Sequence, residues 1–354
     1  MAHMTNPARP GTVVLDLLDD IPAPATDASA PEALVRRCPR HAETPLVPDD
    51  ALARMAGVAA FHLKDETERM GLGSFKATGA AYVIASHADE AARRTGAAFT
   101  EALAGRTYVT ASAGNHGLSV AAGAAFTGAR AVIYLARTVP DAFADRLRAH
   151  GAEVRVEGAT YEESMAAAER AAEAEGMVLL SDSSWPGYHD LPHRLMEGYL
   201  IIAAEMVRQM EEPPTHLFLQ AGVGGMAAAL AAHARKAWPD ITIVVVEPDE
   251  APAVLESVRA GRAVTVSGGV SNMGRLDCKE PSLIALKGLA RDADHFVTVS
   301  DAAAASTVER LGTLSWATTP SGAAGIVAAL DPEIATAVGM DGTSRIVAIV
   351  SEGA

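Results

Sequence analysis

Short apolar runs with the length of β-strands alternate along this chain with alanine-rich stretches that have helical spacing. Most of the apolar runs are continuous, as is typical of strands buried on both faces of a parallel sheet. A repeated strand–helix–strand order restricts the chain to the α/β folds. The expected strands are 60–64, 107–110, 131–135, 153–156, 178–181, 216–220, 241–246, 296–299 and 345–350. The expected helices are 74–89, 116–127, 140–150, 161–175, 193–210, 224–236 and 301–311.

The length of 354 residues is sufficient for about two domains. Four of the expected strands fall within residues 85–180, in compact strand–helix units. We therefore predict two αβα subdomains with mostly parallel sheets. Residues 1–84 and 181–354 form the large one, and residues 85–180 form a small, mobile one. Residues 5–33 lack periodicity and are expected to form an irregular arm.

The composition excludes several classes of function. Asp and Glu total 44 against 29 Lys and Arg, which leaves a formal charge of −15. A surface this negative repels phosphate backbones and anionic lipids, so neither a nucleic acid nor a membrane is an expected partner. The two cysteines, Cys38 and Cys278, cannot form a disulfide framework, and their spacing predicts no metal site. These features indicate a cytoplasmic protein.

A lysine follows a glycine and a serine in the segment Leu72–Ala80, at the start of an expected helix. Desolvation and the positive end of the helix dipole would both lower the pKa of Lys76 there. A neutral amine in such a place can form a Schiff base. A single lysine is nevertheless more often an exposed surface cation.

Glycine-rich turns follow two of the expected strands. The first, within Thr110–Gly117, presents backbone N–H groups to an anion such as a carboxylate, and Asn115 can add a side-chain hydrogen bond. His116 is a candidate base. Alone, such a turn is more often only the N-cap of the following helix.

The second turn, Gln220–Met226, offers backbone amides without bulky side chains and can cradle a phosphate. It also matches a dinucleotide fingerprint, because Gly222, Gly224 and Ala227 have the GxGxxA spacing. Glu247 then ends a strand 25 residues after Gly222. The segment by itself does not distinguish these two interpretations.

The order of these segments along the chain resembles that of fold-type-II pyridoxal-phosphate enzymes, the tryptophan synthase β-like superfamily. Within it, the diaminopropionate ammonia-lyases are the most similar family. The resemblance runs from about residue 38 to the end. It is also carried by Lys64–Glu66, Asp182–Tyr188, Met196–Tyr199, Cys278–Pro281 and Ser351–Gly353. It implies a pyridoxal 5'-phosphate cofactor in the cleft between the two subdomains.

The resemblance also implies roles for individual residues. Lys76 would carry the cofactor and remove the Cα proton of the substrate, and Asp182 would protonate the leaving group or the liberated amine. Ser351 would face the pyridine nitrogen, and Asn115 the ring hydroxyl. The cofactor phosphate would be bound by Gly222, Val223, Gly224, Gly225 and Met226, and the substrate carboxylate by Ser112, Ala113, Gly114 and His116.

A serine hydroxyl cannot keep the pyridine nitrogen protonated as a carboxylate would, and this favours rapid loss of a β-substituent over transamination. We therefore expect α,β-elimination from an L-amino acid with a β-leaving group, giving a 2-oxo acid and ammonia. The substrate would be diaminopropionate-like or an anionic analogue. A β-replacement synthase, a serine or threonine dehydratase and a racemase remain alternatives on the same fold. An NAD-dependent dehydrogenase, based on the fingerprint at Gly222, is a remote one.

Two departures from the ammonia-lyase pattern bear on specificity. Those enzymes have an aspartate, the base for the D-isomer, where this chain has Ala113. Three charged residues, Arg275, Asp277 and Lys279, also replace small ones. Arg275 is a candidate clamp for a second carboxylate or other anionic group of the substrate, or else a solvated loop charge. We expect a relative with altered specificity and, as is usual in the family, a homodimer.

Overall fold

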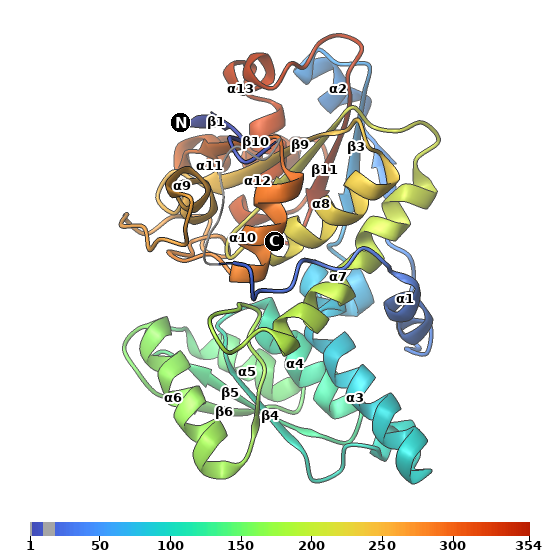
Figure 1. Ribbon diagram of the computed structural model, residues 1–354, viewed down its shortest axis with the longest axis vertical. Helices are drawn as coiled ribbons and strands as arrows, with labels where there is room; N and C mark the ends of the chain where they lie inside the picture. Colours follow the sequence, from blue (N-terminus) through green and yellow to red (C-terminus); the bar gives the residue numbers. More distant parts are fainter. Residues whose placement is uncertain (1, 10–17) are drawn as a thin grey trace.

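The computed structural model describes residues 2–9 and 18–354, which form two lobes, one above the other in Figure 1. The upper lobe is built on a seven-stranded sheet and the lower one on a four-stranded sheet. The helix α7 (Asp190–Gln209) lies where the lobes meet, and the chain ends between them. The predicted α/β class, with two mostly parallel sheets, is confirmed. The exact domain boundaries and the mobility of the smaller unit stay predictions.

The upper sheet has the strand order β1-β10-β9-β8-β11-β3-β2. Its inner strands run parallel, whereas β1 and β2 at the two edges are antiparallel to their neighbours. The bounds are β1 His3–Thr5, β2 Leu46–Pro48, β3 Ala60–Asp65, β8 His216–Gln220, β9 Thr242–Pro248, β10 His295–Val299 and β11 Arg345–Val350.

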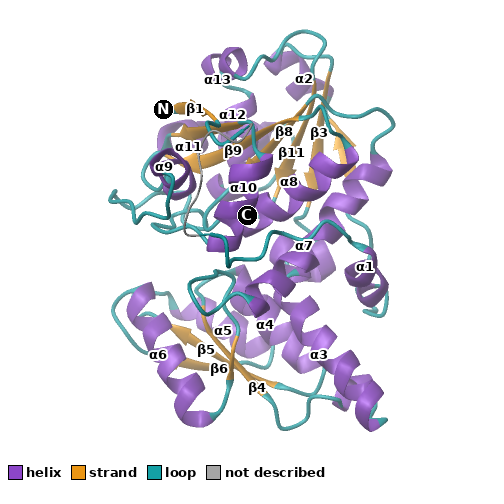
Figure 2. Cartoon of the chain, in the orientation of Figure 1, coloured by secondary structure: helices purple, strands orange, loops and turns teal. Residues whose placement is uncertain are grey.

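Helices cover both faces of this sheet, and for this reason its strands lack polar alternation (Figure 2). In β9, Ile243 and Val245 face one hydrophobic cluster, while Val244 and Val246 face another. The first cluster includes residues of α7, α8 (Gly225–Ala237), α9 (Ala253–Ala260) and α10 (Leu283–Asp292). The second includes residues of α2 (Asp50–Ala56), α11 (Asp301–Thr313), α12 (Pro320–Ala329) and α13 (Pro332–Ala337).

The lower sheet is parallel throughout, with the order β6-β5-β4-β7. Tyr108 of β4 packs in the cluster that contains α3, α4 and α5, and Val109 packs against α6 on the opposite face. The strand bounds are β4 Thr107–Ala111, β5 Arg130–Leu135, β6 Glu153–Val156 and β7 Val178–Leu179. The helix bounds are α3 Ala80–Thr95, α4 Asn115–Phe126, α5 Asp141–Ala149 and α6 Tyr161–Glu175.

Some sequence expectations were wrong. Residues 74–89 do not form one helix, because a 3₁₀ turn, η2 (Phe75–Thr78), is separated from α3 by Gly79. The expected irregular arm over 5–33 includes the end of β1 and most of α1 (Ser29–Val35), while its residues 10–17 lie outside the described part. The alternation pattern did not reveal β2, α2, α9, α10, α12 or α13. No helix among the described residues combines the length and hydropathy needed to cross a bilayer.

Candidate active site

Most of the predicted site residues, apart from Lys76 and Arg275, come from the carboxyl ends of parallel strands. The turn at Ser112 follows β4, Asp182 follows β7, the loop at Gly222 follows β8, and Ser351 follows β11. Parallel strands end at the same edge of their sheet, and this is where open α/β sheets bind ligands. The contacts below show that the edges of the two sheets meet.

Lys76 lies on the 3₁₀ turn η2, and this turn is tied to the end of β11. The N–H of Phe75 donates to the carbonyl of Ser351 (3.0 Å), and Ser74 forms an isolated β-bridge with Glu352. Gly73, just before this turn, has a left-handed backbone (φ 82°) that favours glycine. The C-terminal segment therefore holds the lysine in place, and Ser351 lies next to it.

Lys76 and Asp182 form an ion pair through Nζ and Oδ2. Burial is the largest single influence and would lower the pKa of Lys76, but the charge and hydrogen bond of Asp182, together with Tyr199 and Cys278, outweigh it and raise this pKa. Burial would likewise raise the pKa of Asp182, but Lys76 and, to a lesser extent, His116 hold it well below its usual value. The expectation of a lowered pKa for Lys76 was wrong, because the sequence does not show that a carboxylate 106 residues away faces the amine.

Two tyrosines that were given no role from the sequence lie near this pair. The Tyr199 ring of α7 has its centroid 6.0 Å from the Lys76 amine, and burial raises its pKa to about 12. Tyr161, at the start of α6, is half exposed. Burial of its hydroxyl end and, to a lesser extent, the charges of Asp182 and Cys278 nevertheless raise its pKa. Tyr161 stands in no motif, and the segment Met196–Tyr199 carries the family resemblance without giving Tyr199 a role, so the packing of the two lobes is what places both tyrosines at the site.

The loop 222–226 fits a phosphate. Gly224 has φ 91°, and the start of α8 has no side-chain cap among the described residues. The first hydrogen bond of the helix runs from Ala228 N–H to the Gly224 carbonyl (2.9 Å), so the preceding amides are not used within the helix. A Cβ on Gly222 would lie 3.0 Å from the Arg275 carbonyl oxygen and from Cys278 Sγ. Amides that the helix does not use and this close packing match the needs of an anion cradle.

The residue required for a dinucleotide site is used elsewhere. Glu247 is fully buried, and its carboxylate accepts hydrogen bonds from the N–H groups of Val254 (2.7 Å) and Leu255 (2.8 Å). Burial raises the pKa of Glu247 to about 8. A carboxyl group that caps α9 in this way does not face a ribose bound at Gly222, so the loop lacks the acidic partner of that fingerprint.

The turn Ser112–Gly117 is closed by its own serine, whose Oγ accepts from the N–H groups of Gly114 (3.2 Å) and Gly117 (3.1 Å). His116 is buried, and its Nε2 lies 2.8 Å from the Leu180 carbonyl oxygen, two residues before Asp182. Burial lowers the pKa of His116. Its position links the turn to the strand end that carries Asp182.

Asn115 connects this turn to the end of the chain, because its Nδ2 donates to Glu352 Oε2 (2.5 Å). Glu352 also accepts from Thr319 through Oε1 (2.5 Å). The Arg275 side chain lies beside the same turn, with Nη1 3.4 Å from the Ala113 carbonyl oxygen. Glu352 was not singled out from the sequence, although it directly follows Ser351. The structure thus brings together residues from all of the predicted segments.

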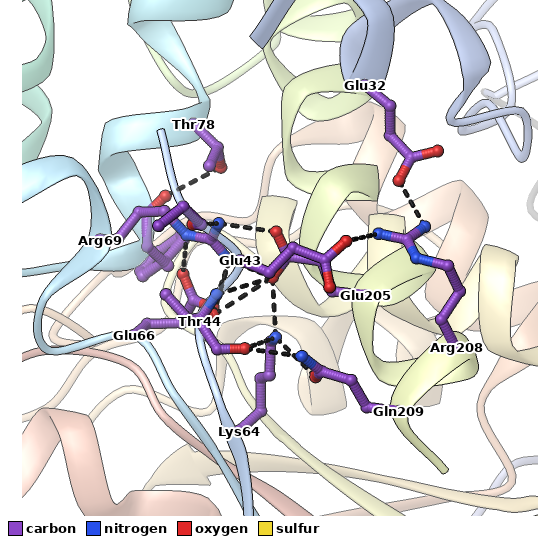
Figure 3. Close-up of polar contacts among 12 residues, drawn as sticks. Glu32, Glu43, Thr44, Lys64, Glu66, Arg69, Thr78, Glu205, Arg208 and Gln209 are labelled. Atoms are coloured by element: carbon purple, nitrogen blue, oxygen red, sulfur yellow. Dashed lines mark hydrogen bonds and ion pairs between the residues drawn. The ribbon is translucent and has the colours of Figure 1, made fainter. Parts of the chain in front are cut away.

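A buried network of ion pairs, shown in Figure 3, fixes the chain segment that leads to the lysine turn. Arg69 donates to both oxygens of Glu66 (2.7 Å each) and to both oxygens of Glu205 on α7 (2.6 and 2.8 Å). Lys64 on β3 donates to Glu205 (2.7 Å) and to the Thr44 carbonyl (2.6 Å). These four charges sum to zero, and each is fully buried or nearly so. The network joins α7, which carries Tyr199, to the segment that leads to Lys76.

Comparison with known proteins agrees with this geometry. A family model described as pyridoxal-phosphate dependent enzyme matches residues 38–352. The chain is 33% identical to diaminopropionate ammonia-lyase of Salmonella typhimurium over 293 residues, covering 77% of this chain and 72% of that protein. It is 34% identical to the Escherichia coli enzyme of the same name over 284 residues, covering 76% and 71%.

Solved structures of the Escherichia coli ammonia-lyase are also similar. The complex with an aminoacrylate–pyridoxal-phosphate azomethine intermediate has a TM-score of 0.85 at 26% identity, covering 99% of this chain and 93% of that chain. The D-serine complex has a TM-score of 0.84 at 27% identity, with the same coverage. The similarity confirms the expected fold type and cofactor. The chain belongs to the pyridoxal-phosphate-dependent enzymes of fold type II.

Proposed function

We propose that this protein is a pyridoxal-phosphate-dependent ammonia-lyase that removes a β-substituent and the Cα proton from an L-amino acid. The products would be a 2-oxo acid, ammonia and the leaving group. The observation that carries the proposal is the Lys76–Asp182 ion pair, which lies among the phosphate cradle, the Ser112 turn and the end of β11. The relatives named as ammonia-lyases support the reaction class.

The bound cofactor withdraws electrons from the Cα atom of an attached amino acid. Lys76 is the group placed to anchor the cofactor and to take the Cα proton. Asp182 is placed to move a second proton. Its pKa is held low by the charge of Lys76, against burial. Once the amine of Lys76 is uncharged, the main influence that opposes burial is gone and the pKa of Asp182 rises, so Asp182 can hold a proton and pass it to the leaving group.

The remaining roles follow the positions of the side chains. The amides of 222–226 bind the phosphate, Asn115 and Ser351 orient the ring, and the Ser112–His116 turn holds the substrate carboxylate. Ala113 carries a methyl group that cannot accept a proton, so position 113 supplies no base for a D-amino acid. We therefore assign the enzyme a preference for L-substrates.

Three finer assignments belong to the same proposal. The enzyme is a cytoplasmic homodimer, as is usual for its class. Residues 85–180 move as a unit against the rest of the chain when substrate binds, because the site lies between the two sheets. The dehydrogenase alternative is disfavoured, since Glu247 caps α9 and does not face Gly222.

The proposal is tested by the visible absorption of the purified protein. We expect a yellow band that borohydride bleaches, with the added mass on the peptide that contains Lys76. Lys76→Ala should lose both the band and the release of ammonia. Lys236→Ala, at the exposed far end of α8, is the control and should keep both. A protein that stays colourless with added pyridoxal phosphate, or an active Lys76→Ala variant, would refute the assignment.

A further inference from the structure

The Arg275 side chain crosses from the phosphate loop to the substrate turn. Its carbonyl oxygen packs against Gly222, and its own N–H donates to Ser321 Oγ (3.1 Å). The far part of the side chain lies over Gly114, with Cδ and Nε 3.5 Å from the position that a Cβ on that glycine would take. The backbone therefore fixes Arg275 at one wall of the site, and the guanidinium reaches the opposite wall.

The guanidinium has hydrogen-bonding capacity to spare. Among the described residues its contacts are one long hydrogen bond to the Ala113 carbonyl (3.4 Å) and an ion pair with Glu352 at 3.7 Å. Both oxygens of Glu352 already accept shorter hydrogen bonds, from Asn115 and Thr319. A guanidinium carries five donor hydrogens in a planar fork that matches an anion with two oxygens. The side chain is also 47% exposed, so a ligand can reach it.

We propose that Arg275 selects substrates whose β-substituent is anionic. This inference rests on the proposed function, because it names the substrate class of the same site. The α-carboxylate is already assigned to the Ser112–His116 turn, so the guanidinium is left for a second anion. Its charge would also repel a β-ammonium group, such as that of diaminopropionate. The side chain of Ala113, whose carbonyl the guanidinium contacts, carries no charge that would neutralise Arg275.

A phosphate ester is a suitable probe of this class. In O-phospho-L-serine the Cα–H bond and the Cβ–O bond break, and the electron pair of the Cβ–O bond leaves with the phosphate. Lys76 takes the Cα proton. One water then hydrolyses the enamine to pyruvate and ammonia, so the reaction needs no oxidant or reductant. Arg275 would bind the phosphate oxygens by charge-assisted hydrogen bonds.

The test compares kcat/KM for three substrates that differ in the charge of the β-group. These are O-phospho-L-serine (anionic), β-chloro-L-alanine (neutral) and L-2,3-diaminopropionate (cationic). The holoenzyme is compared with Arg275→Ala and Arg275→Lys. Arg259→Ala on α9 is the control, because it removes an exposed arginine that is paired with Glu256. Pyruvate formation is measured, and cofactor affinity is followed by absorption.

For Arg275→Ala we expect a loss of about 10- to 100-fold on O-phospho-L-serine, the size of a lost hydrogen-bonded charge contact. β-Chloro-L-alanine should change less than about threefold, diaminopropionate should improve, and Arg275→Lys should recover part of the loss. Equal losses on all three substrates would overturn the inference and assign Arg275 to the α-carboxylate. Weakened cofactor binding in Arg275→Ala would assign Arg275 to the cofactor phosphate. Unchanged kinetics would show that Arg275 is only a solvated charge. Failure of the wild-type protein on every substrate would instead refute the proposed function.

Discussion

At the scale of single residues, the chemistry depends on a pair of opposite charges that stabilise each other's ionised form. Replacing Asp182 with Asn removes the charge that raises the pKa of Lys76 and leaves no group to pass on a proton. We expect kcat/KM to fall by about 100-fold or more, with the cofactor still bound. Ammonia release and visible absorption measure the two effects. Asp190→Asn, which changes an exposed carboxylate at the start of α7, should be silent. Asp182→Asn activity within threefold of wild type would contradict the role.

Ala113 leads to a second prediction at this scale, on the choice of enantiomer. An aspartate at 113 would introduce a group that can accept a proton, but Arg275 lies next to this position and would pair with it. The double variant Ala113→Asp, Arg275→Gly should therefore gain measurable pyruvate formation from a D-substrate, whereas Ala113→Asp alone should gain less. If neither variant acts on β-chloro-D-alanine, Ala113 does not determine the preference.

At the scale of elements, α9 begins on a buried carboxyl group. The pKa of Glu247 is raised to about 8, above its ordinary value of 4.5. Between these values the folded state keeps a proton that the unfolded chain releases, so stability falls as the pH rises through this window. Glu247→Gln does not titrate, so its stability relative to wild type should rise from pH 5 to pH 8, by up to about 1.4 kcal/mol per pH unit. Urea unfolding at both pH values tests this, with Glu256→Gln as the control. If the unfolding free energies of Glu247→Gln and wild type change equally with pH, Glu247 does not keep its proton in the folded state.

The helix α7 offers a matched comparison between a buried ion pair and an exposed one. Glu205 accepts from both Arg69 and Lys64 in the buried network, whereas Arg208, one turn later, pairs with Glu32 and Glu43 at the surface. Glu205→Gln leaves buried positive charge uncompensated and should cost about 3–5 kcal/mol of unfolding free energy. Arg208→Gln should cost less than about 1 kcal/mol. Equal losses of unfolding free energy for the two variants would show that the buried network is no more important for stability than the exposed ion pairs.

At the scale of the whole molecule, the site exists only where the edges of the two sheets meet, so a bound cofactor links the lobes. Pyridoxal phosphate at 100 times its dissociation constant should add about 2.7 kcal/mol to the unfolding free energy. Hydrogen exchange should slow both in the Ser112–Gly117 turn of the lower lobe and in the 222–226 loop of the upper one. Protection confined to one of these segments would indicate that the cofactor does not bridge the lobes.

Much of this architecture is readable from local patterns. The spacing of apolar residues within a stretch indicates whether one face or both are buried, so every strand except the short edge strands β1 and β2 could be predicted. A glycine-rich turn between a strand and a helix likewise has its shape encoded in adjacent residues, as at Gln220–Met226. Short edge elements such as β2 escaped detection, because three residues carry no periodicity.

The sequence by itself determined the α/β class, the lysine segment and the anion-binding turns, and through them the family and its cofactor. The tertiary structure decided what the charged groups do. It paired Lys76 with Asp182, engaged the Glu247 carboxyl group in capping α9, and laid Arg275 across the substrate turn. Apolar periodicity is a local property of the chain. The pKa and the partner of a charged side chain depend instead on groups tens or hundreds of residues away, and only the folded chain brings these groups together.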